Sequence, residues 1–587
     1  MQTLQQLDYW AIAIYMLLMA GIGLFLGKFV KNISDYFKGG NAIPWVSGAI
    51  SNFMTKFSTF IFVAYAGIAY QHGFVALTLI WSTVLPALVG VAIFAKRWRR
   101  AGVLTPLEYL ETRFNAPVRQ VFSWMGVFFK ILDNMVRLYA LGLFVKAATS
   151  LSLETSILVC GIIVALYTVV GGLWAVVVTD VVQFIILIVA TLILVPLTIQ
   201  AAGGLPKMMA TIPEHFTWFN GPKGMPLYLM VYYLMILVKY SGNWTFIQRF
   251  YSVRDERASQ KQGMLTAVFF FLFPIIFLFP SIAAKALIPN LENPEMAYVS
   301  VCLKLLPEGI MGLMVAAMFA ATMSVLSGEY NVTAGVLTRD IYQRLFNPKA
   351  ADREMLWVGR MMTVVLGSLI TIGALYVGGF GGAFEANKLF TGLFAIPMTL
   401  PLVLGIVLKK PQPWGAFATL IVGMGLGLIL NAMPQISWEW ATFIEIVACV
   451  LVFLLSGITS VQTDAYRLRV EAFFRRLNTP LTEAEKPQEN PAFMQVMNRL
   501  YAVALTVTGS LFLVMSLPSL SETSGRVACG AGLLCLLLAP LMWYRTRNLS
   551  NAGSDLQSAA DRDLQSRSSS VADLKSAAKA QSDIKSE

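Results

Sequence analysis

The sequence predicts an all-α protein that crosses a membrane many times. Of its 587 residues, 57% are hydrophobic and 13% are charged, and the mean hydropathy is +0.67. Soluble proteins carry about 25% charged residues. Apolar runs of roughly 20 residues, the length that a helix needs to cross a bilayer, recur from one end of the chain to the other. Strand-like alternation is absent, so the runs are predicted as helices.

About fifteen runs are predicted as transmembrane helices. They cover residues 8–28, 44–70, 74–95, 118–145, 154–171, 175–199, 226–247, 263–287, 308–336, 355–378, 384–408, 413–432, 437–457, 498–517 and 525–543.

The basic residues of the connections predict the orientation. With the N-terminus outside, alternate connections face the cytoplasm, and these hold most of the Lys and Arg residues, as the positive-inside rule requires. The outer connections hold few, such as Lys207, Lys223 and Lys304. The net charge of +12 is therefore spread over separate loops, which argues against nucleic acid as a partner.

Two polar segments are predicted on the cytoplasmic side. Residues 459–496 form a loop that includes an amphipathic helix around Tyr466–Leu477, expected on the membrane surface. Residues 546–587 are rich in Ser, Ala, Asp, Lys and Gln and are predicted to be a disordered tail. Paired histidines, a zinc-ligand spacing and a nucleophile elbow are absent from the sequence, so we expect neither an enzyme nor an organic cofactor.

The predicted span 308–336 contains several polar side chains. They are Thr322, Ser324, Ser327, Glu329, Asn331 and Thr333. Because hydrocarbon offers no hydrogen-bond partner, each must find one inside the protein. Ser324 and Ser327 share a helix face. Oxygen atoms at one depth suit a small hard cation such as sodium, and polar packing between helices is the alternative.

Five segments, in order along the chain, resemble the sodium/solute symporter family, which includes sodium/glucose and sialic-acid transporters. The segments are DYFKGG (35–40), TPLEYLETRF (105–114), GGLWAVVVTDVVQ (171–183), Gln248-Arg249, and the stretch 316–342 with its AAxMS and DIY elements.

The resemblance implies a leucine-transporter-type fold with a five-plus-five inverted-repeat core at residues 31–410. Repeat one would cover 44–200 and repeat two 226–410, with an extra N-terminal helix in 1–30 and extra C-terminal helices in 411–545. The first helix of each repeat would be broken at the midplane, where carbonyls and helix ends build the binding sites.

By the family pattern, the main sodium site uses backbone carbonyls of Met54, Phe57 and Ala321 and the hydroxyl of Ser324. Val325 stands where a second hydroxyl is expected. Lys56 falls within the expected break, where sugar-transporting members have a neutral residue. An ammonium there can replace sodium, titrate, or pair with an acid. A sodium-independent or proton-coupled transporter is therefore the alternative.

Some members have a second sodium site, and the resemblance extends to its residues. Asp180 matches its acid, and Ser324 and Ser327 match two of its hydroxyls, whereas Gly328 replaces a third. The alternative for Asp180 is a salt bridge to a buried base, for which Lys56 is a candidate.

A charged stripe indicates the solute site. Lys130, Asp133 and Arg137 lie on one face of the predicted helix 118–145. Arginine grips a carboxylate with two parallel hydrogen bonds, and sialic-acid transporters of the family are similar in placing an Arg here. We expect an anionic solute bound by Arg137, Lys239, Asn243 and Lys56. An internal Asp133–Arg137 pair is the alternative.

Together these features predict sodium-coupled uptake of a small organic solute, such as a sugar, a sialic acid or another carboxylate, across the cell membrane. A membrane sensor with a transporter-like core is the alternative from another class, but the tail is too short for a signalling domain. The sequence carries no signal for an oligomeric state.

Overall fold

The computed structural model describes residues 4–27, 33–219, 225–458, 463–487 and 491–544. Their regular structure is helical, and Ile43 and Val253 form an isolated bridge. The chain divides into two compact units, residues 1–487 with 511–531, and residues 488–510 with 532–587. The first unit contains every candidate site residue. The predicted tail 546–587 lies outside the described residues.

The helices of the first part of the chain precede residue 202. They are α1 (Gln6–Gly27), α2 (Ile33–Lys38), α3 (Trp45–Met54), α4 (Ala66–His72), α5 (Val75–Trp81), α6 (Val84–Val89), α7 (Ala95–Ala101), α8 (Glu108–Arg113), α9 (Ala116–Ala148) and α10 (Leu153–Ala201), with the π-helical turns η2 (Ile61–Tyr65) and η3 (Gly90–Phe94).

The later helices follow in two groups. The first is α11 (Leu205–Thr211), α12 (Met225–Ser241), α13 (Trp244–Ser252), α14 (Glu256–Leu287), α15 (Ala297–Leu305), α16 (Ile310–Val336), α17 (Asp352–Ala374), α18 (Ala383–Phe390) and α19 (Ile396–Gly405), with η5 (Pro294–Met296), η6 (Leu337–Phe346) and η8 (Thr391–Ala395). The second is α20 (Pro413–Asn431), α21 (Trp438–Leu455), α22 (Asp464–Asn478), α23 (Pro491–Ser516) and the helix Thr523–Tyr544.

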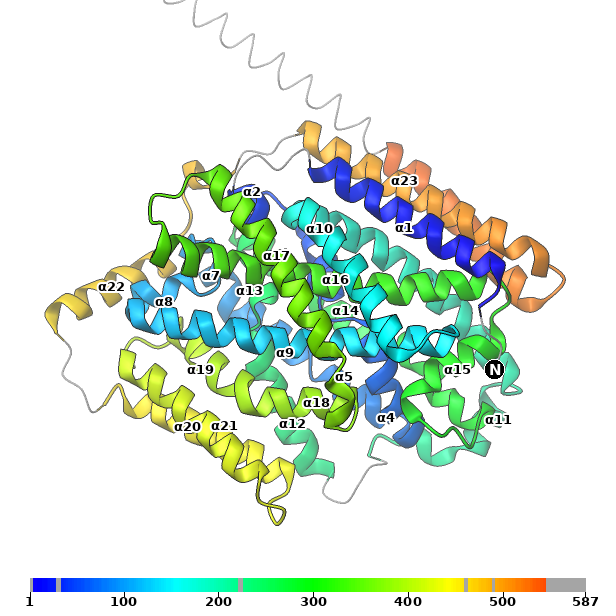
Figure 1. Ribbon diagram of the computed structural model, residues 1–587, viewed down its shortest axis with the longest axis horizontal. Coiled ribbons are helices and arrows are strands. Elements are labelled where there is room, and N and C mark those ends of the chain that lie inside the picture. The colour runs from blue at the N-terminus through cyan, green and yellow to red at the C-terminus, as the bar shows by residue number, and fades with distance from the viewer. Residues whose placement is uncertain (1–3, 28–32, 220–224, 459–462, 488–490, 545–587) are drawn as a thin grey trace, which may run out of the picture. The chain divides into compact units, whose positions relative to one another are not determined.

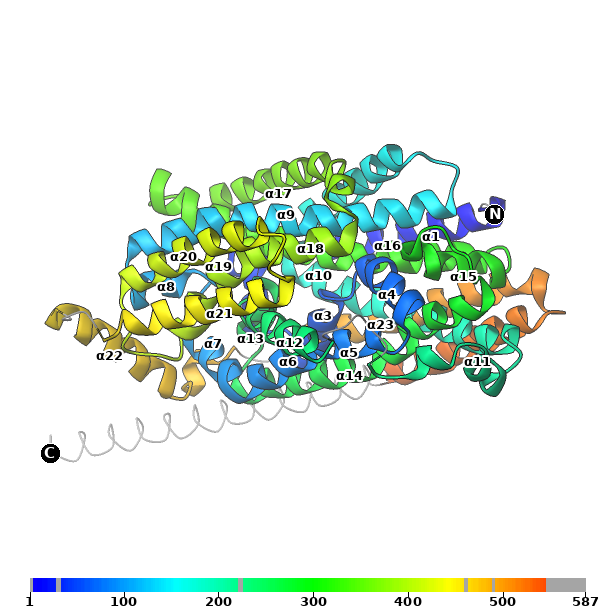
Figure 2. The ribbon, with the colours of Figure 1, turned by 90° about the horizontal axis from the view of Figure 1, so that it is seen from below.

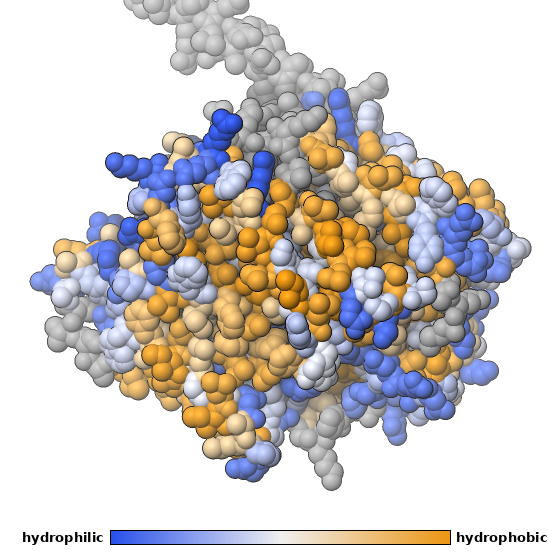
Figure 3. Space-filling model, in the orientation of Figure 1, coloured by the Kyte–Doolittle hydropathy of each residue, from blue (hydrophilic) through white to orange (hydrophobic). Residues whose placement is uncertain are grey.

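The predicted spans coincide with helices, although not all are continuous. Ten described stretches are long and apolar enough to cross a membrane, and the bent pair α12–α13 makes up to eleven. Shorter apolar helices cover Gln6–Ile22 and Leu153–Leu166. Two predicted spans remain. One is the broken helix at 44–70, and the other is α9, whose charged residues lower its mean hydropathy. Large apolar side chains on these helices face outward, as lipid contact requires, and they gather across the middle of the face in Figure 3.

Helix α16 is the centre of the first unit. Its most apolar window is fully buried, and it packs against α9, α10 and α17, which surround it in Figures 1 and 2. The polar residues that the sequence placed on this helix are therefore held inside protein and away from lipid. This burial explains how the helix keeps six polar side chains at membrane depth.

Both predicted helix breaks are present, and local side chains explain them. Helix α3 ends at Met54, where Thr55 Oγ1 donates to the Asn52 carbonyl at 2.9 Å and competes with the helix ladder. Helix α12 ends at Ser241, and Asn243 restarts the chain as the N-cap of α13 by accepting from two backbone amides. A Cβ on Gly242 would lie 2.6 Å from Thr399 Cβ, so only glycine lets α19 approach this break.

The amphipathic helix predicted around Tyr466–Leu477 is present as α22, and its place on the membrane surface stays a prediction. Helix α22 buries its apolar side, including Phe473 and Leu477, against α7 and α8 of the same unit. Tyr466 accepts from Arg113 Nη1 at 2.7 Å, and the Phe473 ring stacks on Tyr109. Protein covers the buried part of this apolar side, because α7 and α8 offer partners such as the Tyr109 ring.

Candidate functional site

Six charged side chains form a buried group at the centre of the first unit, which we call the central cluster. It lies between the two helix breaks, α9 and α16, and all six side chains are buried. The members are Lys56, Lys130, Asp133, Arg137, Lys239 and Glu329.

Glu329 of α16 organises one half of the central cluster. Lys130 Nζ of α9 lies 2.8 Å from Glu329 Oε2, and Lys56 Nζ lies 3.6 Å from Oε1. Lys56 Nζ also donates to Asn243 Oδ1 at 2.6 Å and to Thr245 Oγ1 at 2.9 Å. Lys56 therefore pairs with an acid, and its side chain connects the break after α3 with the start of α13.

Asp133 of α9 organises the other half. Arg137 Nη2 donates to Asp133 Oδ2 at 2.9 Å, so the internal pair foreseen as an alternative is present. Lys239 Nζ lies 3.3 Å from Asp133 Oδ1 and donates to Thr391 Oγ1 at 2.7 Å. The end of α12 is thereby tied to both α9 and η8. Thr391 was missed from the sequence, because a threonine in an apolar run carries little signal by itself.

The central cluster holds more positive than negative charge. Four basic side chains face two carboxylates among the described residues. Several buried donors nearby have no hydrogen-bond partner in the described part of the chain, namely Arg137 Nε, Ser241 Oγ and Trp244 Nε1. Buried charges and donors are costly unless they are paired. The arrangement is thus suited to a ligand that brings negative charge and acceptor oxygens.

The residues expected at the main sodium site lie on two elements that pack against each other, the end of α3 with the break that follows it, and α16. Met54 and Phe57 flank the break after α3, Ala321 and Ser324 lie on α16, and all four are buried. The break closes onto α16 through Thr59, whose Oγ1 donates to the Met318 carbonyl at 2.6 Å. The ammonium of Lys56 points instead to Glu329, one helical turn beyond Val325.

The residues expected at the second sodium site surround Asp180 only in part. Ser324 Oγ donates to Asp180 Oδ1 at 2.5 Å, and Ser51 Oγ donates to Oδ2. Ser327 Oγ instead donates to the Ser324 carbonyl at 3.2 Å. The base that faces Asp180 is Arg249, with Nη2 at 3.8 Å from Oδ2 and Nε donating to Ser51 Oγ at 3.1 Å.

Arg249 occupies space that Gly328 leaves free. A Cβ on Gly328 would lie 3.2 Å from Arg249 Nη2. The predicted span 226–247 ends before Arg249, which was therefore expected in the connection that follows, but in the structure Arg249 lies within α13 and is only 1% exposed. The available signal was the Gln248-Arg249 segment, which resembles the family.

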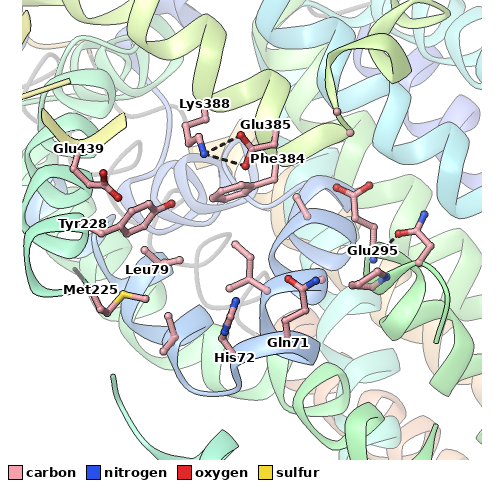
Figure 4. A pocket seen from close by; sticks show the side chains of 18 of the residues that line it. Gln71, His72, Leu79, Met225, Tyr228, Glu295, Phe384, Glu385, Lys388 and Glu439 are labelled. Atoms are coloured by element: carbon pink, nitrogen blue, oxygen red, sulfur yellow. Dashed lines mark hydrogen bonds and ion pairs between the residues drawn. The ribbon is translucent and has the colours of Figure 1, made fainter. Parts of the chain in front are cut away.

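A cavity of about 590 Å³ opens at the end of the first unit where the predicted outer connections lie. Figure 4 shows Tyr228, Phe384, Glu295 and the ion pair between Lys388 and Glu385 around it. Burial raises the pKa of Glu295, although the backbone amides of Phe384 and Ala383 donate to its carboxylate and oppose the change.

Two tyrosines lie next to the residues that line the cavity. The Tyr65 and Tyr232 hydroxyls lie 2.5 Å apart, and the Tyr65 ring packs edge-on against Phe384, which lines the cavity.

The opposite end of the first unit is tied by ion pairs. Arg119 of α9 binds Asp340 of η6 and also lies 2.8 Å from Glu111 Oε2. Arg344 lies 2.6 Å from Glu111 Oε1. Burial alone would raise the pKa of Glu111, but hydrogen bonds from Arg344 and Arg119 lower it overall. Ion pairs therefore tie α8, α9 and η6 together at this end, around a second cavity of about 560 Å³.

Comparison with known proteins gives relatives over most of the chain. The sodium/glucose cotransporter of Vibrio parahaemolyticus is 26% identical over 466 residues, 73% of this chain and 86% of the relative. The sodium/sialic acid symporter NanT of Aliivibrio fischeri is 24% identical over 489 residues, 78% and 94% of the two chains. Myo-inositol cotransporter 2 of Sus scrofa is 26% identical over 477 residues, 73% of this chain and 70% of the relative.

A solved structure shares the fold. It is a Na+-coupled sialic acid symporter in a substrate-bound, outward-open state, with a TM-score of 0.69, 22% sequence identity, and coverage of 78% of this chain and 98% of that chain. The all-helical fold with broken spans is thus that of a leucine-transporter-type membrane protein. The model of the sodium:solute symporter family matches residues 36–423, and the chain belongs to that family of transporters.

Proposed function

We propose that this protein carries a small organic anion into the cell together with sodium. The observation that supports an anion is the excess of two positive charges in the central cluster, accompanied by the unpaired donors Arg137 Nε and Ser241 Oγ. Relatives act on a neutral sugar or a sialic acid, and the buried positive charge favours the acid for this chain. Arg137 would bind the carboxylate, with Lys56, Lys239 and Asn243 around the rest of the solute.

We place the sodium ion at the set formed by Met54, Phe57, Ala321 and Ser324. Carbonyl and hydroxyl oxygens of this kind suit a hard cation, and a broken helix presents its free carbonyls there. At Asp180 we infer that the guanidinium of Arg249 supplies the positive charge, so that this acid holds no second sodium ion. The basic inner connections support an N-terminus outside and a cytoplasmic tail in the cell membrane.

A sodium-independent or proton-coupled transporter is the second candidate. Val325 provides no oxygen to the main set, and Lys56 brings an ammonium group into the same break. In that case the ammonium of Lys56 would stabilise the break after α3, as a sodium ion would in a sodium-coupled transporter.

The nature of the solute is tested by thermal stability of the purified protein, since a ligand that binds the folded state raises its apparent stability. N-acetylneuraminate is compared with its methyl ester, and glucuronate with glucose, so that each pair differs by a carboxylate. We expect stabilisation by an acid and not by its neutral partner, with loss of the effect in Arg137→Gln and retention in Arg467→Gln, an exposed control. Stabilisation by the neutral partners alone would contradict the proposal.

The ion is tested in the same assay with sodium, potassium and choline chlorides. We expect a saturable rise with sodium that Ser324→Ala abolishes and Ser327→Ala retains, because only Ser324 belongs to the main set. If Ser327→Ala also abolishes the rise in stability with sodium, the second sodium site at Asp180 would be supported instead. No response to sodium would favour the sodium-independent candidate.

A further inference from the structure

Glu445 is a buried acid of the first unit that the transport proposal does not use. It lies on α21, is 1% exposed, and its Oε1 has no hydrogen-bond partner among the described residues. The other buried acids have partners. Asp8 accepts from backbone amides, Asp133 pairs with Arg137, Asp180 with Arg249, Glu329 with Lys130, and Asp340 with Arg119.

Two glycines form the space that Glu445 occupies. A Cβ on Gly392 of η8 would lie 3.7 Å from Glu445 Oε2, and a Cβ on Gly427 of α20 would lie 3.8 Å from the carboxyl carbon. The carboxyl group therefore sits in a notch between α21, α20 and η8. Figure 2 shows α19, α20 and α21 side by side around this part of the fold.

The elements around the notch offer no counter-charge. Helices α19 and α20 contain no acidic or basic residue. On α12 the base is Lys239, which is already bound to Asp133 and Thr391, and on α18 Lys388 pairs with Glu385. On α21 itself, Cys449 donates to the Thr419 carbonyl, and Glu439 lies in the first turn, beside the outer cavity. A carboxylate buried without a partner is costly, and protonation removes the cost.

The notch is connected to the central cluster through one peptide bond. Gly392 follows Thr391, whose hydroxyl accepts from Lys239 Nζ at 2.7 Å. Both residues belong to η8, a π-helical segment, and such segments are frequent at functional sites. A carboxylate at Glu445 would need water in the notch, and a movement of η8 that admits water would also move Thr391, the partner of Lys239.

We propose that Glu445 is a proton-binding site of the transport cycle. Glu445 holds a proton while η8 and α20 close over it, and it releases that proton when η8 moves and water enters the notch. The proton leaves to water and returns from water, so no other co-reactant is needed. The link to transport rests on the proposed function, whereas the binding of a proton does not.

Protonation of Glu445 is tested by labelling the purified full-length protein with dicyclohexylcarbodiimide. This hydrophobic carbodiimide reacts with protonated carboxyl groups in apolar surroundings. We expect the mass of one reagent molecule on the peptide that contains Glu445, with at least tenfold less in Glu445→Gln. Glu439→Gln, on the same helix but at the cavity, is the matched control and keeps the label. An unlabelled Glu445 would overturn the proposal.

The coupling is tested with two readouts, the first independent of any solute. Thr391→Val removes the hydroxyl that holds η8 to Lys239, and we expect severalfold faster labelling of Glu445, while Thr371→Val on α17 leaves the rate unchanged. An unchanged rate in Thr391→Val would overturn the coupling. Where uptake is measured, we expect the pH dependence of wild-type uptake to flatten in Glu445→Gln, and labelling with an unchanged pH profile would likewise overturn the coupling.

Discussion

Arg137 is the residue on which recognition of an anion depends. Its Nη2 binds Asp133, and its Nε is unpaired, so one edge of the guanidinium remains for a carboxylate. Arg137→Lys keeps the positive charge but removes the two parallel N–H donors of the guanidinium group. We expect the affinity for an acidic solute to fall about tenfold to a hundredfold, which corresponds to about 1.4–3 kcal/mol. Calorimetric titration checks this, and equal affinities in the two proteins would remove Arg137 from the solute site.

The ion pair between Arg249 and Asp180 leads to a second prediction at the scale of residues. Removing one partner of a buried ion pair leaves an uncompensated charge and costs about 3–5 kcal/mol. We expect Arg249→Gln to lower the melting temperature strongly, because Asp180 then lacks its base. We also expect high sodium, but not choline, to restore part of the loss, because the ion can now enter beside Asp180. A variant as stable as the wild type in choline would show that Arg249 does not neutralise Asp180.

Single residues also show how much of the candidate site could be predicted from the sequence. Ser324 and Asp180 were expected at one ion site and are in contact, since the motif fixes both registers. Arg249 was expected in a loop, because hydropathy ends a span at its first base. Glu329 was expected among the polar residues of the span 308–336, but its pairing with Lys56 and Lys130 was not predicted, because pairings between residues far apart in the chain leave no local pattern.

At the scale of elements, the break between α12 and α13 serves both structure and binding. Asn243 caps α13 and accepts from Lys56 Nζ at 2.6 Å. Loss of an N-cap costs about 1 kcal/mol. We expect Asn243→Ala to lose this stability and, in addition, most solute and sodium binding. Asn115→Ala, which removes the N-cap of α9, is the matched control and should lose stability alone. Equal binding losses in both variants would mean that the break acts only through stability.

The elements themselves were largely predictable, because apolar length is a local property that one sequence displays. Spans such as α14 and α17 follow directly from it. The packing of α22 was not predictable, because an amphipathic face shows only that something apolar covers it. The role of η8 was also hidden, since a π-helical turn depends on its neighbours α18, α19 and α20. The division into repeats stays a prediction from the family resemblance.

At the scale of the first unit, both ends carry a cavity, and ion pairs of Glu111 tie α8 to α9 and η6 at one of them. The pKa of Glu111 lies below its usual value of 4.5, so its contribution to stability is present above that value and is lost as the pH falls through the lowered pKa. Because the pair is partly exposed, we expect Glu111→Gln to cost only about 0.5–1 kcal/mol near pH 7. Melting curves near pH 7 and below pH 4 check this, and a cost that persists in acid would exclude the ion pairs as its source.

The most direct test of the account is uptake into proteoliposomes under an inward sodium gradient. Acidic solutes, N-acetylneuraminate and glucuronate, are compared with glucose and myo-inositol in wild-type protein, with Arg137→Gln and Arg467→Gln as the variant and its control. We predict that an acidic solute accumulates in wild type and Arg467→Gln but not in Arg137→Gln, and that choline in place of sodium abolishes accumulation. Accumulation of glucose or myo-inositol that is unaffected by Arg137→Gln would contradict the account.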